Sequence, residues 1–134
     1  MKTDDAAEQT GPDLWLPVAA SADLVDGGLG VRFAVHAYGV DTTGFVIRFK
    51  GVVRGYLNRC AHVPIELDWA AGEFLESSKR FIMCQTHGAI YEPETGFCAG
   101  GPCKGGRLRP ISVREVDGRI AWLPDAVVTA PATT

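Results

Sequence analysis

Two cysteines and two histidines form two mixed pairs, Cys60-Ala61-His62 and Cys84-Gln85-Thr86-His87. The whole chain has four cysteines and three histidines, so these two short segments contain half of the cysteines and most of the histidines. Thiolate sulfur and imidazole nitrogen are ligands that transition metals prefer in proteins. The pairs therefore indicate a metal centre built from two loops, with 21 residues between them, from Val63 to Met83.

The residues after the second pair complete a longer pattern. Gly88 follows His87, Tyr91 comes three residues later, a turn of the form Glu92-Pro93-Glu94-Thr95-Gly96 follows, and Gly101-Pro102 marks a third loop. In this order of motifs the chain resembles the Rieske [2Fe–2S] family over about residues 14 to 124. Two cysteines on one iron and two histidines on the other define that centre.

The resemblance implies one Rieske-type [2Fe–2S] cluster and assigns residues to it. Its ligands would be Cys60, His62, Cys84 and His87, and the residues around it would include Tyr91, Gly88 and Pro102. Zinc is the alternative, because a tetrahedral site also accepts two cysteines and two histidines. Zinc fingers, however, usually pair cysteine with cysteine and histidine with histidine, whereas both pairs here are mixed.

The spacer between the pairs is somewhat longer than is usual in the family. We interpret the excess, around Glu66 to Glu73, as an enlarged excursion from the first ligand loop. Such an insertion is tolerated because the entropic cost of closing a loop grows only with the logarithm of its length. Its acidic residues are expected to be ordinary solvated charges. They are Glu66, Asp68, Glu73 and Glu76.

Composition limits the class of protein. With 134 residues, 46% of them hydrophobic, the chain is long enough for one domain with its own core. The formal net charge of -3 gives no support for nucleic-acid binding, and no apolar run is long enough for a transmembrane helix. The acidic residues 1–8 lack the apolar core of an export signal, so we expect a cytoplasmic protein without a membrane partner.

Short β-rich segments separated by Gly, Pro and Asp predict an all-β fold. They cover residues 14–18, 31–36, 44–49, 52–58, 80–83, 90–91, 108–116 and 119–123, with a hairpin turn at Asp117-Gly118. A helical turn is expected only in the spacer or at residues 19–24. This agrees with the Rieske fold, an antiparallel β-sandwich or barrel. We expect a disordered tail at 1–12, one Rieske domain at 13–125 with a cluster-binding subdomain at about 57–105, and a flexible tail at 126–134.

The histidine count narrows the function within the family. Rieske oxygenases need two further histidines and a carboxylate for a mononuclear iron, and only His36, expected to be structural, remains. We therefore expect an electron carrier rather than an enzyme: a soluble ferredoxin between a flavin reductase and a terminal oxygenase. The alternative is the electron-transfer small subunit of a larger reductase, as in nitrite reductase; a structural zinc module would be a third function.

Two further expectations concern the surroundings of the cluster. High-potential family members have a serine two residues after the second histidine, and this chain has Ala89 there. We therefore expect a reduction potential in the low to middle part of the Rieske range. The hydroxyl of Tyr91 should raise that potential somewhat. Cys98 and Cys103 could bridge each other. Because a cytosolic location disfavours a disulfide, we expect free thiols that pack beside the cluster.

Overall fold

The computed structural model of the chain describes residues 15–61, 65–68 and 70–131. The described residues form three antiparallel sheets and one short 3₁₀ turn, η2 (Ser21–Asp23), which lies inside the segment where a helical turn was expected. The all-β prediction is confirmed. The predicted tail at 1–12 lies outside the described residues.

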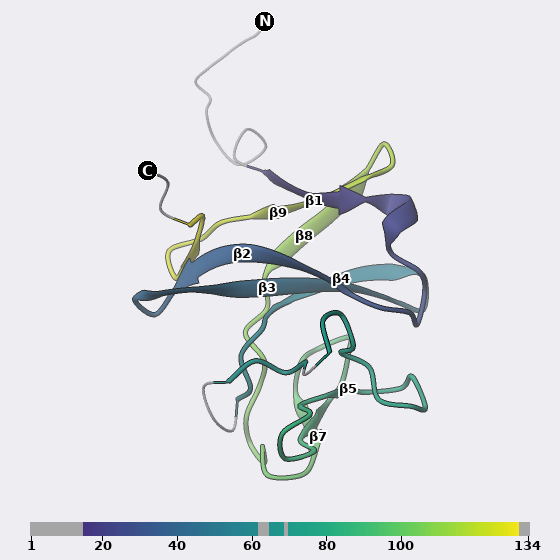
Figure 1. Ribbon diagram of the computed structural model, residues 1–134, viewed down its shortest axis with the longest axis vertical. Helices are drawn as coiled ribbons and strands as arrows, with labels where there is room; N and C mark the ends of the chain where they lie inside the picture. The colour runs from purple at the N-terminus through teal and green to yellow at the C-terminus, as the bar shows by residue number, and fades with distance from the viewer. Residues whose placement is uncertain (1–14, 62–64, 69, 132–134) are drawn as a thin grey trace, which may run out of the picture.

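Two of the sheets pack against each other at one end of the molecule (Figure 1). The first has the order β1 (Leu16–Ala20), β9 (Arg119–Leu123), β8 (Ser112–Val116), and the second has the order β10 (Val128–Thr129), β2 (Val31–Ala37), β3 (Val40–Phe49), β4 (Val52–Leu57). A hydrophobic core lies between them, in which Phe33 of β2 packs against Trp122 of β9 with ring centroids 5.2 Å apart.

An ion pair also joins these two sheets. The guanidinium of Arg48 on β3 donates to both carboxylate oxygens of Glu115 on β8, over 3.0 and 2.7 Å. Arg48 also donates to the carbonyl oxygens of Leu24 and Ser21, so the same guanidinium group holds the segment after β1 in place. Such two-pronged contacts fix orientation more tightly than a single hydrogen bond.

Asp117 and Gly118 form the predicted hairpin turn between β8 and β9. Both have positive φ, 54° and 77°, and Val116 pairs with Arg119 across them. Positive φ at both central positions is the type I′ geometry, whose twist matches that of the flanking strands. The prediction made from Asp-Gly is confirmed.

The third sheet lies at the opposite end and has the order β5 (Ile82–Met83), β6 (Ile90–Tyr91), β7 (Cys98–Gly100) (Figure 1). A second hydrophobic core connects it to β3 and β4. Phe74 of the spacer stacks on Phe45 of β3, with centroids 3.8 Å apart and ring planes inclined by 7°. The spacer is thus packed into this core rather than projecting from it.

The prediction of a flexible tail from residue 126 is wrong for its first half. β10 pairs with β2, with Val128 opposite Ala37, and the side chain of Val128 is 1% exposed. The backbone N–H groups of Val127 and Val128 donate to the carboxylate of Asp125, which fixes the turn into β10. Burial of one valine side chain and pairing with β2 order a segment whose composition suggested a tail.

Candidate metal centre

Cys60 and Cys84 lie in two loops that follow β4 and β5. The N–H of Cys60 donates to the carbonyl oxygen of Ile65, and the N–H of Cys84 donates to that of Ala89, each over 2.8 Å. The N–H of Gly88 closes the second loop on the carbonyl oxygen of Cys84 over 2.9 Å. Gly88 has φ 76°, a backbone conformation that costs glycine nothing and other residues more.

The two cysteine thiols are neighbours in the second core. Cys60 is 3% exposed and Cys84 is 0% exposed. Burial raises the pKa of the Cys84 thiol, and the adjacent Cys60 thiol raises it further. The fold therefore brings the two predicted cysteine ligands from different loops to one place, where they could bind a single iron.

Of the two predicted histidine ligands, His87 falls within the described residues. His87 lies at the exposed turn of the second loop, three residues after the buried Cys84. His62 lies outside the described residues. Among the residues that the structure describes, no three His, Cys, Asp or Glu side chains gather as a conventional metal site. A Rieske cluster does not need three, because each of its irons takes only two protein ligands.

Tyr91 contacts the first ligand loop from β6. Its hydroxyl oxygen lies 3.2 Å from Sγ of Cys60 and accepts a hydrogen bond from the N–H of Ala61 over 3.0 Å. Burial raises the pKa of Tyr91, and the contact with Cys60 adds to the rise, so the hydroxyl keeps its proton in the physiological pH range. Since the oxygen already accepts from Ala61, its proton is available to the sulfur of Cys60.

The third loop, residues 98–106, contacts both ligand loops. A Cβ on Gly101 would lie 3.0 Å from Cα of Ala89 and 3.1 Å from the carbonyl oxygen of Gly88, and a Cβ on Gly106 would lie 3.0 Å from Cβ of Ala61. Only glycine allows this close approach without displacing its neighbours. Pro102 lies at the exposed tip of the same loop, directly after Gly101.

Cys98 and Cys103 form a disulfide within the third loop, with Cα atoms 5.7 Å apart. The expectation of two free thiols is therefore wrong. That expectation rested on the compartment, whereas the hairpin-like return of the chain after β7 brings the two Cα atoms to a separation that a disulfide spans. Cys103 belongs to the core that contains Cys60 and Cys84, and Cys98 packs against that core; their position beside the cluster stays a prediction.

A buried polar network at Asn58 and Asp68 was missed by the sequence analysis. The side-chain amide of Asn58 donates to Asp68 over 3.0 Å, and its oxygen accepts from the N–H of Leu67 over 2.8 Å. Asp68 also accepts from the N–H of Gly72 over 2.9 Å, and Nε of Arg32 lies 3.8 Å from its carboxylate.

This network joins the start of the spacer to both ligand loops. Asn58 precedes Cys60 by two residues, and the N–H of Gln85, next to Cys84, donates to the carbonyl oxygen of Leu67 over 2.9 Å. Asp68 is 6% exposed, so its assignment as a solvated charge is wrong. The alternation of apolar residues from Ile65 to Leu67 predicts an outward Asp68, and its partners are too distant in sequence to give a local signal.

His36, the third histidine, lies on β2 near the other end of the molecule. Its Nδ1 is 2.9 Å from the carboxylate of Asp41 across the β2–β3 hairpin. His36 thus lies on a strand, as expected, and its structural role stays a prediction.

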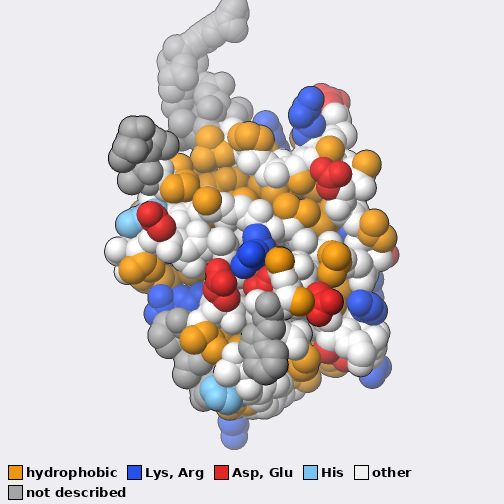
Figure 2. Space-filling view, viewed as in Figure 1, with side chains coloured by type: hydrophobic (Ala, Val, Ile, Leu, Met, Phe, Trp, Pro, Cys, Tyr) orange, Lys and Arg blue, Asp and Glu red, His pale blue; other side chains and the backbone are white. Residues whose placement is uncertain are grey.

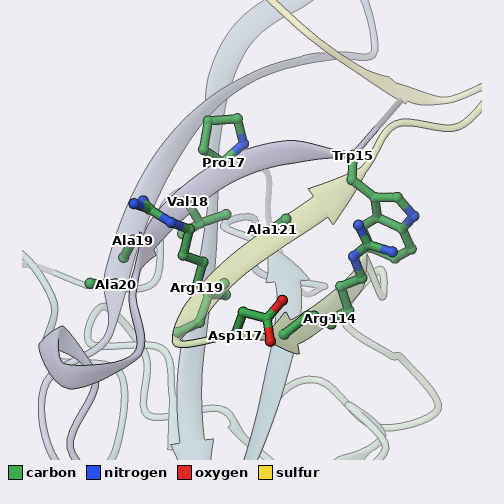
Figure 3. A pocket seen from close by; sticks show the side chains of 11 residues that line it. Trp15, Pro17, Val18, Ala19, Ala20, Arg114, Asp117, Arg119 and Ala121 are labelled. Carbon is green, nitrogen blue, oxygen red and sulfur yellow. The ribbon is translucent and has the colours of Figure 1, made fainter. Parts of the chain in front are cut away.

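A shallow groove of about 590 Å³ lies on the sheet of β1, β9 and β8, which Figure 1 shows at the opposite end of the molecule from β5 and β7 (Figures 1 and 3). Its floor is formed by small apolar side chains of β1 and β9, including Val18 and Ala121. At one end the guanidinium of Arg114 stacks on Trp15, 4.6 Å from the ring centroid, and Asp117 and Arg119 lie toward the other end (Figure 3). The groove has no cysteine or histidine and is not part of the metal centre.

The fold and the paired cysteine loops are those of a cluster-binding β-domain, and the sequence comparison gives its family. Residues 14–123 match the Rieske [2Fe-2S] domain, so the chain belongs to the Rieske family. Membership implies one Rieske-type [2Fe–2S] cluster, and thereby favours iron and sulfide over the zinc alternative. A search of curated protein sequences finds no match.

Several solved structures share this fold at low sequence identity. The ferredoxin of carbazole 1,9a-dioxygenase from Nocardioides aromaticivorans IC177 is 22% identical, with a TM-score of 0.65 over 83% of this chain and 98% of that one. A chain in a complex of reduced oxygenase and oxidized ferredoxin of carbazole 1,9a-dioxygenase is 23% identical, with a TM-score of 0.63 over 82% of this chain and 93% of that one.

A larger protein contains a similar domain. The terminal oxygenase of carbazole 1,9a-dioxygenase from Novosphingobium sp. KA1 is 24% identical, with a TM-score of 0.61 over 89% of this chain and 30% of the oxygenase. At these identities the similarities establish the fold. In the part of the chain that the structure describes, no helix has the length and apolar character needed to cross a membrane.

Proposed function

We propose that this protein is a cytoplasmic Rieske-type ferredoxin that passes single electrons from a flavin reductase to a terminal oxygenase. Cys60, His62, Cys84 and His87 would hold its cluster, which supplies reversible one-electron transfer when bound. The observation that carries the proposal is the contrast between the buried thiols of Cys60 and Cys84 and the exposed His87. The similarity in fold to a ferredoxin over 98% of its length supports it.

The residues at this end of the molecule would have separate roles in electron transfer. The second core excludes water from the thiols of Cys60 and Cys84, and the hydroxyl of Tyr91 provides a hydrogen-bond donor at Cys60. His87, being exposed, would face the redox partner. Transient redox encounters use small interfaces, which suits a narrow end formed by three loops.

The first experiment tests the ligands. The purified protein should be red-brown, contain two irons per chain and give a rhombic EPR signal on reduction. The variant His87→Ala should lose the cluster, whereas His36→Ala, the matched control at the histidine on β2, should keep it. A colourless protein, or an unchanged EPR signal in His87→Ala, would refute the ligand assignment.

The second experiment tests the partners. With a flavin reductase and a Rieske terminal oxygenase, product formation should depend on this protein and saturate as its concentration rises. Oxygenase turnover that is the same with and without the protein would exclude that oxygenase as its acceptor. If no member of a panel of oxygenases responds, the carrier proposal is wrong.

One observation favours the second candidate, a permanently bound subunit of a larger reductase. Apolar side chains gather over the end of the molecule where β1 and β9 lie (Figure 2), and residues of the same two strands line the groove beside Trp15. Large exposed apolar surfaces often mark permanent contacts. A subunit would purify in a stoichiometric complex that survives high salt, whereas a ferredoxin would purify as a single chain.

A further inference from the structure

We propose that the Cys98–Cys103 disulfide is a second redox site, which exchanges with the dithiol of a partner protein, and whose reduction loosens the third loop against the two ligand loops. The exchange itself goes beyond the proposed function and does not depend on it. Its effect on the cluster rests on the proposed ligands.

The first argument is the position of the bridge. It closes the loop whose Gly101 leaves no room for a Cβ beside Gly88 and Ala89, in the second ligand loop. Gly106 of the same loop leaves little room beside Ala61, which follows Cys60. The loop thus lies against both ligand loops. A change in its conformation would therefore act on Ala61, next to Cys60, and on Gly88 and Ala89, which follow His87.

The second argument is the connection to Tyr91. In the pairing of β6 with β7, Tyr91 lies opposite Cys98 and Ile90 lies opposite Gly100. The same Tyr91 contacts the sulfur of Cys60. One end of the bridge is therefore fixed to the strand position that places a donor hydroxyl at the predicted ligand.

The third argument is access. Cys98 is half-buried, and the neighbouring residues Ala99, Gly101 and Pro102 are exposed, so the bridge lies just beneath the surface at the tip of the loop. Cys103 is 3% exposed. An incoming thiolate would therefore attack the sulfur of Cys98, and Cys103 would leave into the interior.

The fourth argument is that the fold also accommodates the reduced state. Sγ of Cys103 lies 3.2 Å from the carbonyl oxygen of Gly100 and 3.5 Å from that of Ile90. Sulfur in a disulfide carries no proton, so these are only contacts while the bridge is present. After reduction the Cys103 thiol can donate to either carbonyl, so this buried donor has an acceptor within reach.

The exchange balances as an ordinary two-electron reaction. One thiolate of the partner dithiol attacks Cys98, the Cys98–Cys103 bond breaks, and the Cys103 thiolate that leaves takes up a proton. The second thiol of the partner then attacks the mixed disulfide and releases Cys98 as a thiol. Two electrons and two protons pass from the dithiol to the bridge, and the partner becomes a disulfide. In reducing compartments, disulfides are commonly of this exchanging kind.

The test uses the cluster-loaded protein under anaerobic conditions, with thioredoxin and its reductase as the dithiol source. After an acid quench, alkylation and peptide mass analysis should show label on both Cys98 and Cys103 while the visible absorption of the cluster is retained. Label at these positions only after the absorption is lost would overturn the proposal, and so would label without any reductant.

The consequence for the cluster is tested separately. The double variant Cys98→Ser/Cys103→Ser mimics the reduced loop, because a serine hydroxyl can donate to the same carbonyl oxygens. Cluster loss to an iron chelator should become about tenfold faster than in the wild type, since the short bridge no longer opposes local opening. The control Ala99→Ser, an exposed position in the same loop, should match the wild type.

Wild-type protein reduced by thioredoxin supplies the same measurement without any substitution, so a double variant that fails to fold does not end the test. Equal rates of cluster loss in the oxidised and reduced wild type would refute the effect on the ligand loops. Failure of the proposed function would look different: no electrons would reach an oxygenase, while the labelling of Cys98 and Cys103 would be unaffected.

Discussion

Removal of the Tyr91 hydroxyl should lower the reduction potential of the cluster. The hydroxyl oxygen accepts from the N–H of Ala61 and lies 3.2 Å from Sγ of Cys60, so its proton is available to a thiolate there. Reduction adds negative charge to the centre and strengthens any hydrogen bond donated to its sulfurs. Tyr91→Phe removes this donor and therefore destabilises the reduced state more than the oxidised one.

The size of the shift follows from the strength of one such bond. A hydrogen bond to a charged group contributes about 1.5–3 kcal/mol, and only its change between the two redox states affects the potential. If about half of it changes, the difference is about 0.7–1.5 kcal/mol, which for one electron corresponds to about 30–65 mV. Because burial and the Cys60 contact raise the pKa of Tyr91, the shift should be constant between about pH 5 and pH 8.

Tyr56→Phe is the matched control for this measurement. Tyr56 is also buried, and its hydroxyl donates to the carbonyl oxygen of Pro93 over 2.8 Å rather than to a cysteine. Burial raises its pKa to about 12, so it too remains protonated. Protein-film voltammetry below pH 7 should show the lower potential in Tyr91→Phe alone. Equal potentials in the two variants and the wild type would refute the donor role of Tyr91.

Three further predictions concern the loops and the sheets. Gly101→Ala should destabilise the fold and speed cluster loss more than Gly105→Ala does. Both glycines have positive φ, 83° and 80°, but of the two only Gly101 lies against the second ligand loop. Equal effects of the two substitutions in chelator and urea assays would disprove that contact. Ala89→Ser should raise the potential measured by voltammetry if the new hydroxyl donates to the cluster, and an unchanged value would show that it does not. Arg48 lowers the pKa of Glu115 to about 2, so part of the wild-type free energy of unfolding should be lost as the pH falls from about 4.5 to 2. In urea unfolding, Glu115→Gln should not show this pH-dependent loss. The same loss of stability with falling pH in the variant and the wild type would contradict the prediction.

The parts of the fold that the sequence predicted depend on local chemistry. Asp117-Gly118 determines its hairpin through the φ values of two adjacent residues, and β6 follows from two β-prone residues beside a glycine turn. The approach of Tyr91 to Cys60 was predicted only through the family resemblance. Nothing in a spacing of 31 residues implies that contact by itself.

The parts that the sequence did not predict depend on distant partners. Asp68 is buried because Asn58 and Gly72 donate to it and Arg32 lies nearby, and none of these pairings has a sequence signature. Val128 forms an edge strand because β2 offers an open edge and a buried site, not because its own segment is β-rich. Free thiols at Cys98 and Cys103 were expected because of the cytosolic location. Whether the two cysteines can bridge depends instead on the separation of their Cα atoms, which the sequence does not give.

The disulfide also changes how the second core should be understood. Four sulfur atoms lie in it, two predicted to bind iron and two bonded to each other, with Tyr91 among them. In a larger protein, burial of apolar residues alone would order three short loops. Here the third sheet has strands of only two or three residues, so the loops depend on the bridge, the glycine contacts and the Asn58–Asp68 network. The glycine contacts and the Asn58–Asp68 network join the ligand loops to neighbours that are not ligands, and the bridge closes the loop that makes the glycine contacts. Substitutions outside the four predicted ligands should therefore still change how well the protein retains the cluster.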